Sequence, residues 1–372
     1  MNGPGESPNP VGVLIVDDSA FMRTALTRMI DGEPGLQVTG TAQNGVQALE
    51  KIGELKPDVV TLDVEMPRMN GLETLKRIMH DFPRPVIMVS SLTRDGAETT
   101  LEALDIGAFD YVSKPESFAS LDVIRIRTDL VSKIKAAAES DHRHHKLRKA
   151  PRPVAATVKK PLQASRAPAV QPAVVALGTS TGGPKALQQI LPMLPGDLSV
   201  GIVIVQHMPE GFTGPFADRL NRLCQVKVKE AAHDQAIEAG VVYIAPAGRH
   251  LTVSRRTPAQ AILQLSPFPQ DTLHRPSVDV MMTSVAEQFG ASAMGVIMTG
   301  MGADGVKGMR AIGQAGGLTV GQDEHSCTVY GMPKSCAEAG VLQRIVSLTE
   351  IPHEILQATR YQEKPNLHRA PS

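Results

Sequence analysis

The chain has 372 residues, of which 38 are Lys or Arg and 38 are Asp or Glu, so its formal net charge is +0. At about 100–200 residues per domain, this length predicts about two domains with connecting chain. The balanced charge excludes a protein whose whole surface binds nucleic acid. The 3 cysteines form no CxxC pair, which is typical of a reducing compartment and argues against a zinc ribbon or a disulfide framework.

The sequence contains no segment typical of a membrane span or a secretion signal. Its longest apolar runs, such as Val13–Val16 and Val86–Val89, have the length of buried strands. The N-terminal residues lack both the basic region and the hydrophobic region of a signal peptide. We therefore expect a soluble, cytoplasmic protein with no membrane insertion.

One segment differs from the rest in composition. Between His142 and Pro172 the chain has 8 Lys or Arg, 5 prolines and no acidic residue, which is typical of a solvated linker. A basic arm for nucleic acid or a membrane surface is the alternative, but this segment has no interleaved aromatic residues and no amphipathic pattern. We predict a first domain at 11–135, a linker at 139–172 and a second domain at 173–360, with no nucleic-acid partner.

In the first domain, short apolar runs alternate with segments of helical period. Five strand–helix repeats predict a sheet of five parallel strands with helices on both faces, because parallel strands need crossover helices. A last helix is expected from about Leu121 to Ala138. The expected strands are Val11–Val16, Leu36–Thr41, Val59–Leu62, Val86–Val89 and Tyr111–Val112.

The same alternation resumes after the linker. The stretch from Lys227 to Leu265 is richer in strand-forming residues than its surroundings. We predict a second, doubly wound, mainly parallel α/β domain with a small antiparallel excursion in that stretch. Its expected strands are Ala173–Leu177, Val200–Val205, Val226–Val228, Val241–Ile244, Ala261–Leu265 and Ala293–Thr299, and its expected helices are Lys185–Leu191, Phe216–Leu223 and Val306–Gln314.

Three carboxylates are expected at one edge of the first sheet. Asp17 and Asp18 follow the first strand and Asp63 ends the third, and functional residues of an open parallel sheet gather beyond the carboxyl ends of its strands. These carboxylates would repel one another unless a cation neutralised them, and Mg²⁺ prefers such oxygen ligands. A carboxylate beside that ion could attack a phosphoryl donor and become an acyl phosphate.

Two further polar residues are expected at the same edge. Ser90 ends the fourth strand and Lys114 follows the fifth. Lys114 could offset the charge of a transferred phosphoryl group, and Ser90 could donate a hydrogen bond to its oxygens. The alternative is that the aspartates are only turn residues and helix caps.

Four motifs at the strand ends carry a resemblance to a known family. They read VDD, LDVEMPRMNG, VSS and YVSKP, and their combination resembles the response-regulator receiver domain, which has a flavodoxin-like fold, over residues 11–135. Tyr111 stands where receivers often carry a switch aromatic, although it could equally be an ordinary strand residue. The resemblance implies the remaining roles as follows: phospho-acceptor Asp63, metal ligands Asp17, Asp18 and Asp63, switch hydroxyl Ser90 and phosphate-contacting lysine Lys114.

Ser180 lies in a glycine-rich turn between an expected strand and an expected helix. The residues 178–183 read GTSTGG, and Pro184 follows. A G-x-S-x-G turn of this kind exposes the serine hydroxyl beside a helix N-terminus, whose N–H groups could stabilise an oxyanion. A phosphate-binding loop and a structural turn are the alternatives, although the sequence is neither a Walker loop nor a dinucleotide fingerprint.

His207 and Asp304 are the candidate partners of Ser180. His207 directly follows an expected strand, and Asp304 lies in a glycine-rich loop after another, so all three residues are expected at the same edge of the second sheet. The alternatives are a surface histidine and an aspartate that caps the helix after it. The order Ser, His, Asp differs from that of the α/β-hydrolases, but triads are recognised by geometry.

The segments GTSTGGP, VQHMP and MTGMGADG, together with YIAPAGRH and HRPSVDV, resemble the catalytic domain of the chemotaxis protein-glutamate methylesterase (CheB) family. The resemblance implies hydrolysis of glutamate methyl esters on methyl-accepting chemoreceptors, deamidation of particular glutamines, and activation by phosphorylation from a chemotaxis histidine kinase. It implies the nucleophile Ser180, the base His207, the orienting Asp304, and an oxyanion hole from backbone N–H groups near Thr181 and Met301.

The esterase chemistry would need no cofactor, and only phosphorylation of the receiver would need Mg²⁺. Two alternatives remain open. One is an esterase of the same family that serves a receptor array outside chemotaxis, and the other is a phosphorylation-gated binding module that carries out no hydrolysis.

Overall fold

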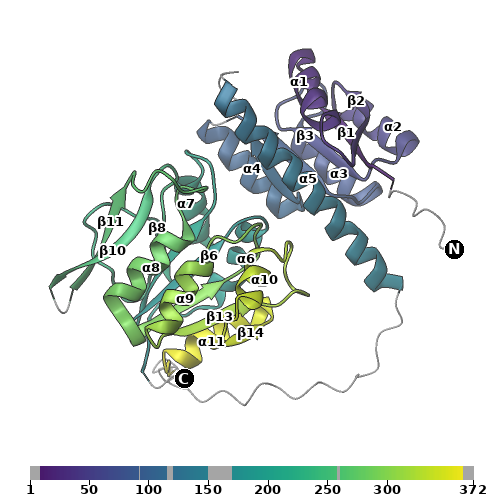
Figure 1. Cartoon of the computed structure of the whole chain (residues 1–372). Helices are drawn as coiled ribbons and strands as arrows, with labels where there is room; N and C mark the ends of the chain where they lie inside the picture. Colours follow the sequence, from purple (N-terminus) through teal and green to yellow (C-terminus); the bar gives the residue numbers. More distant parts are fainter. Residues whose placement is uncertain (1–8, 92, 115–119, 150–169, 258–259, 363–372) are drawn as a thin grey trace, which may run out of the picture. The chain divides into compact units, whose positions relative to one another are not determined.

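The computed structural model describes residues 9–91, 93–114, 120–149, 170–257 and 260–362 (Figure 1). They form two compact units, which are described separately. The N-terminal unit contains a five-stranded sheet, and the C-terminal unit contains a seven-stranded and a two-stranded sheet. No helix in the described part of the chain is long and apolar enough to cross a membrane.

The five-stranded sheet is parallel throughout, in the order β2-β1-β3-β4-β5. Strands β3 and β4 are fully buried, as expected when helices cover both faces of a parallel sheet. The predicted fold of the first domain is confirmed. Its strands are β1 (Val11–Val16), β2 (Leu36–Ala42), β3 (Val59–Asp63), β4 (Val86–Ser90) and β5 (Asp110–Ser113), and its helices are α1 (Ala20–Asp31), α2 (Gly45–Leu55), α3 (Gly71–Asp81), α4 (Arg94–Ile106) and α5 (Ser120–Lys149).

Polar side chains fix where the helices of this unit begin. Ser19, Asn44 and Asn70 stand just before α1, α2 and α3, and the side chain of each accepts a hydrogen bond from a backbone N–H in the first turn. Such caps satisfy N–H groups that have no partner within the helix. Because α1 begins four residues after β1 ends, Asp17 and Asp18 lie in a short turn at the carboxyl end of that strand.

Helix α5 is longer than the sequence pattern predicts. It continues to Lys149, whereas its expected end is Ala138. Residues 139–149 contain neither proline nor glycine, so nothing in them ends a helix, and the first proline after α5 is Pro151. The expected linker at 139–172 therefore begins inside a helix, and its residues 150–169 lie outside the described residues.

The seven-stranded sheet is also parallel throughout, in the order β14-β13-β12-β6-β7-β9-β8. This arrangement confirms a doubly wound α/β domain. The strands are β6 (Val174–Thr179), β7 (Gly201–Gln206), β8 (Lys227–Glu230), β9 (Val241–Ile244), β12 (Ala293–Ile297), β13 (Leu318–Gln322) and β14 (Arg344–Val346). The α-helices are α6 (Gly183–Ile190), α7 (Thr213–Leu223), α8 (Val278–Phe289), α9 (Val306–Gln314), α10 (Met332–Glu338) and α11 (Ile351–Ala358).

The antiparallel excursion is a pair of strands, β10 (His250–Thr257) and β11 (Gln260–Ser266). It is smaller than the β-rich stretch suggests, because β8 and β9 belong to the parallel sheet. Leu251 and Leu263 of the pair share one buried hydrophobic cluster with Met281 and Val285 of α8. The pair and α8 therefore pack together, and residues 267–277 connect them.

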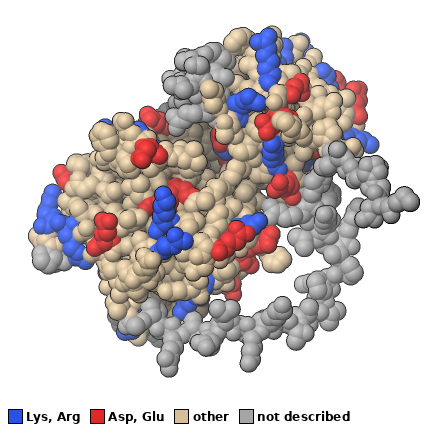
Figure 2. All heavy atoms as spheres, viewed as in Figure 1, with Lys and Arg blue, Asp and Glu red and all other residues tan. Residues whose placement is uncertain are grey.

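Charged residues of both signs are interspersed on the face of the molecule shown in Figure 2, with no large area of one sign. This agrees with the formal net charge of +0 and with the equal numbers of basic and acidic residues. On that face the described residues form no continuous basic surface of the kind that tracks a phosphate backbone.

Candidate functional site

Three adjacent strands of the seven-stranded sheet lead to the three candidate residues. Strand β6 lies between β12 and β7, and Ser180 follows β6 while His207 directly follows β7. Strand β12 ends at Ile297, and the loop after it carries Asp304 before α9 begins. The strand order thus brings to one edge three residues that are far apart in the sequence.

The turn after β6 depends on two glycines. Gly182 has a φ of +76°, which favours glycine, and a Cβ there would lie 2.4 Å from Cβ of Thr328. A Cβ at Gly183 would lie 2.0 Å from Oε1 of Gln206. The backbone N–H of Ser180 donates to the carbonyl of Thr299 at 3.0 Å. Side chains at positions 182 and 183 would therefore clash with Thr328 and Gln206, so the turn requires glycine at both positions.

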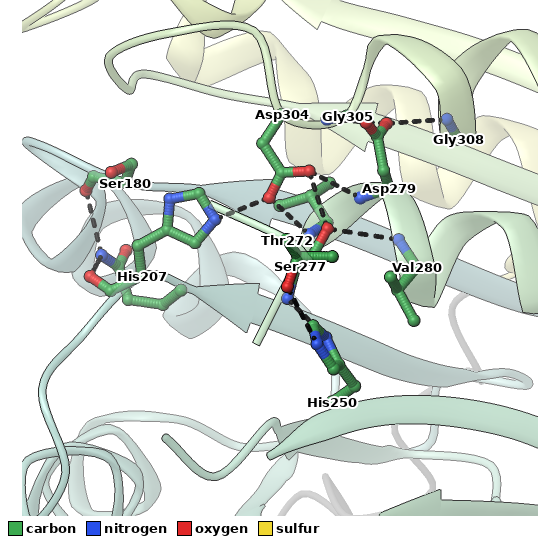
Figure 3. A network of polar contacts seen from close by, with 12 residues as sticks. Ser180, His207, His250, Thr272, Ser277, Asp279, Val280, Asp304, Gly305 and Gly308 are labelled. Carbon is green, nitrogen blue, oxygen red and sulfur yellow. Dashed lines mark hydrogen bonds and ion pairs between the residues drawn. The ribbon is translucent and has the colours of Figure 1, made fainter. Parts of the chain in front are cut away.

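His207 and Asp304 are in direct contact. Nε2 of His207 lies 2.8 Å from Oδ2 of Asp304, and the two side chains are only 8% and 11% exposed. A carboxylate can only accept, so Nε2 carries a proton, and in the neutral form of the ring Nδ1 holds the lone pair. Nδ1 is buried and has no hydrogen-bond partner among the residues that the structure describes. The ring lies between Asp304 on one side and Ser180 on the other (Figure 3), so Ser180 is not yet hydrogen bonded to this histidine.

Asp304 receives donors from the beginning of α8. Its Oδ1 accepts hydrogen bonds from Oγ of Ser277 and the N–H of Asp279, both at 2.9 Å, and its Oδ2 accepts one from the N–H of Val278 at 2.7 Å (Figure 3). Burial acts to raise the pKa of Asp304, but the hydrogen bond and charge of His207 and the backbone N–H groups outweigh it and lower the pKa to about 2. The carboxylate is therefore ionised at neutral pH.

Asp304 does not cap the helix that follows it, so that alternative is wrong. The cap of α9 comes from Asp279, whose Oδ1 accepts the N–H groups of Gly305 and Gly308, each at 2.9 Å (Figure 3). Asp304 thus accepts N–H groups at the beginning of α8, and Asp279 of α8 accepts N–H groups at the beginning of α9. These hydrogen bonds lock the loop that carries Asp304 against α8.

Several residues near this site were not predicted from the sequence. The ring of His274 stacks on that of His207, with ring centres 4.0 Å apart and planes 18° apart. Buried Gln206 donates from Nε2 to the backbone carbonyls of Ser180 and His207. His274 and Ser277 both belong to the HRPSVDV segment, which carries the family resemblance but does not by itself indicate a role for either residue.

The two expected oxyanion-hole residues lie in the turns that follow β6 and β12. Thr181 is buried in the turn before α6, and its carbonyl accepts a hydrogen bond from Oγ1 of Thr299 at 2.9 Å. Met301 follows Gly300 in the loop between β12 and α9. Across the described residues, the backbone N–H groups of Thr181 and Met301 have no hydrogen-bond acceptor.

The three expected metal ligands lie together in the N-terminal unit. Carboxylate oxygens of Asp17, Asp18 and Asp63 all lie within 4.8 Å of one another. Asp17 and Asp63 are 0% and 2% exposed, whereas Asp18 is open to solvent. Three carboxylate oxygens beside solvent suit a hard divalent cation such as Mg²⁺, which keeps several waters.

Lys114 partly compensates this charge. Its Nζ lies 2.7 Å from Oδ2 of Asp63 and 3.3 Å from Oδ2 of Asp17. Burial nevertheless outweighs the lysine and, together with the charge of Asp17, raises the pKa of Asp63 to about 6. Burial acts to lower the pKa of Lys114, but the two carboxylates raise it above its ordinary value. The charge of Lys114 alone therefore does not offset the cost of burying the carboxylate of Asp63.

Ser90 is the last residue of β4, and Tyr111 is the second residue of the neighbouring strand β5. Ser90 is 0% exposed and donates from Oγ to the carbonyl of Gly96 at 3.1 Å, so it faces the first turn of α4. Nζ of Lys133 donates to the backbone carbonyl of Tyr111 at 2.6 Å and lies 5.3 Å from the centre of its ring. Ser90 therefore contacts α4, and Tyr111 contacts α5.

Comparisons with known proteins agree with this architecture. The family model described as "Response regulator receiver domain" matches residues 13–124, and the one described as "CheB methylesterase" matches residues 175–355. The first contains the acidic cluster, and the second contains Ser180, His207 and Asp304.

Similar proteins match over nearly the full chain. A protein-glutamate methylesterase/protein-glutamine glutaminase of Lawsonia intracellularis is 44% identical over 352 residues, which are 93% of this chain and 98% of that protein. One of Bacillus subtilis is 44% identical over 354 residues, 94% of this chain and 99% of that protein.

The crystal structure of the Thermotoga maritima CheB methylesterase catalytic domain is 37% identical and covers 50% of this chain and 99% of that chain, with a TM-score of 0.49.

Fold, site and matches together define the class of protein, a response-regulator receiver domain followed by an α/β methylesterase domain. More specifically, the chain belongs to the CheB family, whose members are named protein-glutamate methylesterase/protein-glutamine glutaminase.

Proposed function

We propose that the chain hydrolyses glutamate methyl esters on methyl-accepting chemoreceptors and deamidates particular receptor glutamines, and that phosphorylation of Asp63 by a chemotaxis histidine kinase activates it. Sensory adaptation in chemotaxis is the process that this reaction serves, and the cytoplasm is where the chain acts. The observation that carries the proposal is the His207–Asp304 contact of 2.8 Å beside Ser180, in a chain whose relatives are named for this activity.

In the proposed reaction, Ser180, His207 and Asp304 form the catalytic triad. Oγ of Ser180 attacks the ester carbonyl while Nδ1 of His207 accepts its proton. The unpartnered Nδ1 supports this role, since it is the ring nitrogen that holds a lone pair. Asp304 keeps the other proton on Nε2 and stabilises the imidazolium that forms. Substrate binding would close the remaining gap to Ser180, because catalytic hydrogen bonds often tighten only in the complex.

The imidazolium then returns its proton to the departing methoxide, which leaves as methanol. Water attacks the acyl-serine with His207 again as base, and glutamate and free Ser180 result. For a glutamine substrate the amide nitrogen must take the proton of the imidazolium before the C–N bond breaks, and it then leaves as ammonia. Deamidation should therefore depend more strongly on His207 as an acid.

The negative oxygen of the tetrahedral intermediate needs donors that are not already bonded. The N–H groups of Thr181 and Met301 meet that requirement, since each lacks an acceptor among the described residues. Thr181 lies in the turn after β6, which also carries Ser180. Met301 lies in the loop after β12, which also carries Asp304. We assign the oxyanion hole to these two groups.

In the receiver domain, Asp63 is the proposed phospho-acceptor, and Asp17, Asp18 and Asp63 would hold Mg²⁺. The bound ion would offset negative charge on the transferred group. Lys114 is close enough to Asp63 to contact the phosphoryl oxygens, and Ser90 and Tyr111 would respond to them. Ser90 would leave Gly96 to donate to the new phosphoryl group, which would alter the beginning of α4. The domain boundaries that we propose are 11–135 for the receiver and 173–360 for the esterase.

The test is methanol release from methylated receptors in membranes by the full-length protein, with and without a small phosphodonor. We expect release that rises with the phosphodonor and that Ser180→Ala abolishes. Ser254→Ala on β10 is the matched control and should retain full activity. Receptor binding without methanol release would support a binding module instead. Release only from the receptors of an array outside chemotaxis would leave the esterase chemistry unchanged but replace chemotaxis as the process that it serves.

A further inference from the structure

Two segments of the sequence meet at a histidine that has no role in the proposed reaction. His250 ends the YIAPAGRH segment and begins β10, and it is 0% exposed. Its Nδ1 accepts a hydrogen bond from the backbone N–H of Ser277, in the HRPSVDV segment, at 3.2 Å (Figure 3). Its Nε2 lies 2.9 Å from the carbonyl of Pro269 and 3.2 Å from Oγ1 of Thr272. Three residues of the segment 267–277, namely Pro269, Thr272 and Ser277, thus contact the ring of His250.

The protonation of this ring follows from its partners. Nδ1 faces an N–H donor, so it must be the acceptor, and Nε2 carries the proton that it donates towards Pro269. Burial lowers the pKa of His250, and the positive charge of Arg275 acts in the same direction. The ring is therefore neutral at neutral pH, in the tautomer that these contacts require.

Residues 267–277, which we call the connecting segment, lie between β11 and α8. They form no helix or strand between β11 and α8. Two of their large apolar side chains, Phe268 and Leu273, are 63% and 85% exposed, so apolar burial of these side chains does not fix the segment. Polar contacts with His250 take that role, helped by a hydrogen bond from the N–H of Gly248 to the carbonyl of Arg275.

The connecting segment touches both residues that assist Ser180. The ring of His274 stacks on that of His207, and Oγ of Ser277 donates to Oδ1 of Asp304 at 2.9 Å. A shift of this segment would therefore move the packing partner of the base and one donor to its carboxylate at the same time. Displacements near 1 Å can lower a rate by about 100-fold when catalytic groups must be held in one geometry.

We propose that His250 is a positioning residue of the esterase: it fixes the connecting segment so that Ser277 orients Asp304 and His274 packs against His207. This inference rests on the triad in the proposed function. The contact with Ser277 is made through a backbone N–H, which cannot relay a proton, so His250 acts through geometry. It touches neither Ser180 nor His207 in the network of Figure 3.

The first test compares ester hydrolysis by full-length variants. We expect His250→Ala to lower kcat by about 10- to 100-fold with little change in KM, because the receptor would still bind but the triad would be misaligned. His250→Asn can still accept from the N–H of Ser277, whereas His250→Gln can still donate towards Pro269. Since the Ser277 contact leads to Asp304, we expect Asn to retain more activity than Gln or Ala.

A matched control separates this effect from the general loss of a histidine. His233 also accepts a backbone hydrogen bond through Nδ1, from Leu265 at 3.0 Å, but its side chain is 53% exposed and this contact is to β11 rather than to the connecting segment. His233→Ala should retain the kcat of the unaltered protein. Equal losses in His233→Ala and His250→Ala would overturn the proposal, as would full activity in a folded His250→Ala or a loss expressed only in KM.

The second test asks whether His250 acts through Ser277. Ser277→Ala removes the hydroxyl that binds Asp304 but keeps the N–H that binds His250. If the two residues act along one path, the double variant should lose no more activity than the worse single variant, whereas additive losses would overturn the proposal. If His250→Ala fails to fold, His250→Asn replaces it in both tests. Activity in Ser180→Ala would defeat the proposed function instead, which keeps the two failures distinct.

Discussion

The two units each bury an aspartate at the carboxyl end of a parallel sheet, and the two environments shift it in opposite directions. The pKa of Asp63 is raised to about 6, because burial and a neighbouring carboxylate outweigh one lysine. The pKa of Asp304 is lowered to about 2, because His207 and the N–H groups that begin α8 outweigh burial. Residue type and place in the fold are the same, so the difference comes from the donors that surround each carboxylate.

This contrast matches the two proposed roles. Asp304 has its stabilising donors built into the fold, so it is ready to orient a base without any added ion. Asp63 has only the N–H of Glu65 at 3.3 Å and the ion pair with Lys114, and in the proposed function a cation would complete its cluster and make the site responsive to metal and to phosphorylation. In the proposed function, one domain therefore holds a preorganised catalytic site, and the other holds a site that a ligand would complete.

The largest expected effect comes from the preorganised site. Asp304→Asn removes the negative charge and the acceptor that keeps the proton on Nε2 of His207. We expect kcat for ester hydrolysis to fall by about 10²- to 10⁴-fold. Asp234→Asn, at an exposed position of the same unit, is the control and should leave kcat unchanged. A loss below threefold in a folded Asp304→Asn would place the orienting group elsewhere.

The next effect concerns the site that needs a ligand. Asp63→Asn should abolish Mg²⁺-dependent, base-labile labelling by a small phosphodonor, and with it the stimulation of methanol release. Asp95→Asn, at an exposed position in α4, should label and respond as the unaltered protein does. Unchanged phosphate incorporation in Asp63→Asn would show that another residue is the acceptor.

Mg²⁺ should stabilise the first unit and leave the second unchanged. A ligand that binds only the folded state stabilises it by about 2.7 kcal/mol at 100 times its Kd. We expect the receiver transition to rise by a few degrees in thermal unfolding when Mg²⁺ is added, and to return when the ion is chelated. NaCl of matched ionic strength and the Asp63→Asn variant are the controls. An equal shift in the esterase transition would contradict the contrast between the sites.

The smallest effect is a pH dependence of stability. The folded pKa of Asp304 is about 2 and its ordinary value is 3.8, so its ionised form stabilises the fold by about 2 kcal/mol above pH 4. That contribution should disappear as the pH falls from about 4 through about 2. Denaturant unfolding of the unaltered protein and of Asp304→Asn across this range should show their difference in unfolding free energy shrink. A constant difference would mean that Asp304 is not the titrating group.

Much of this architecture can be predicted from the sequence, because the apolar runs mark the buried strands and polar residues follow them directly. That rule places Asp17, Asp63, Ser180 and His207 at the sheet edges. It cannot give the length of α5, since charged residues without proline or glycine are compatible with both a helix and a linker.

The hydrogen-bond partners of Asp304 could not be predicted from the sequence, for a different reason. Its cap on α8 joins residues 25 to 27 positions apart, and no local pattern specifies such a contact. The roles of His250 and His274 depend in the same way on how β10 and α8 pack together. Their segments can be recognised as motifs in the sequence, but the residues that His250 and His274 contact come together only in the folded chain.

The central claim is that Ser180 is the nucleophile and that His207 activates it. Its most direct test is labelling of the full-length protein by a serine-reactive fluorophosphonate, followed by peptide mapping and methanol-release assays. We predict a single adduct on Ser180, with activity lost in proportion to labelling, and slow labelling in His207→Ala. An adduct on another residue, or full activity after stoichiometric labelling of Ser180, would contradict the account.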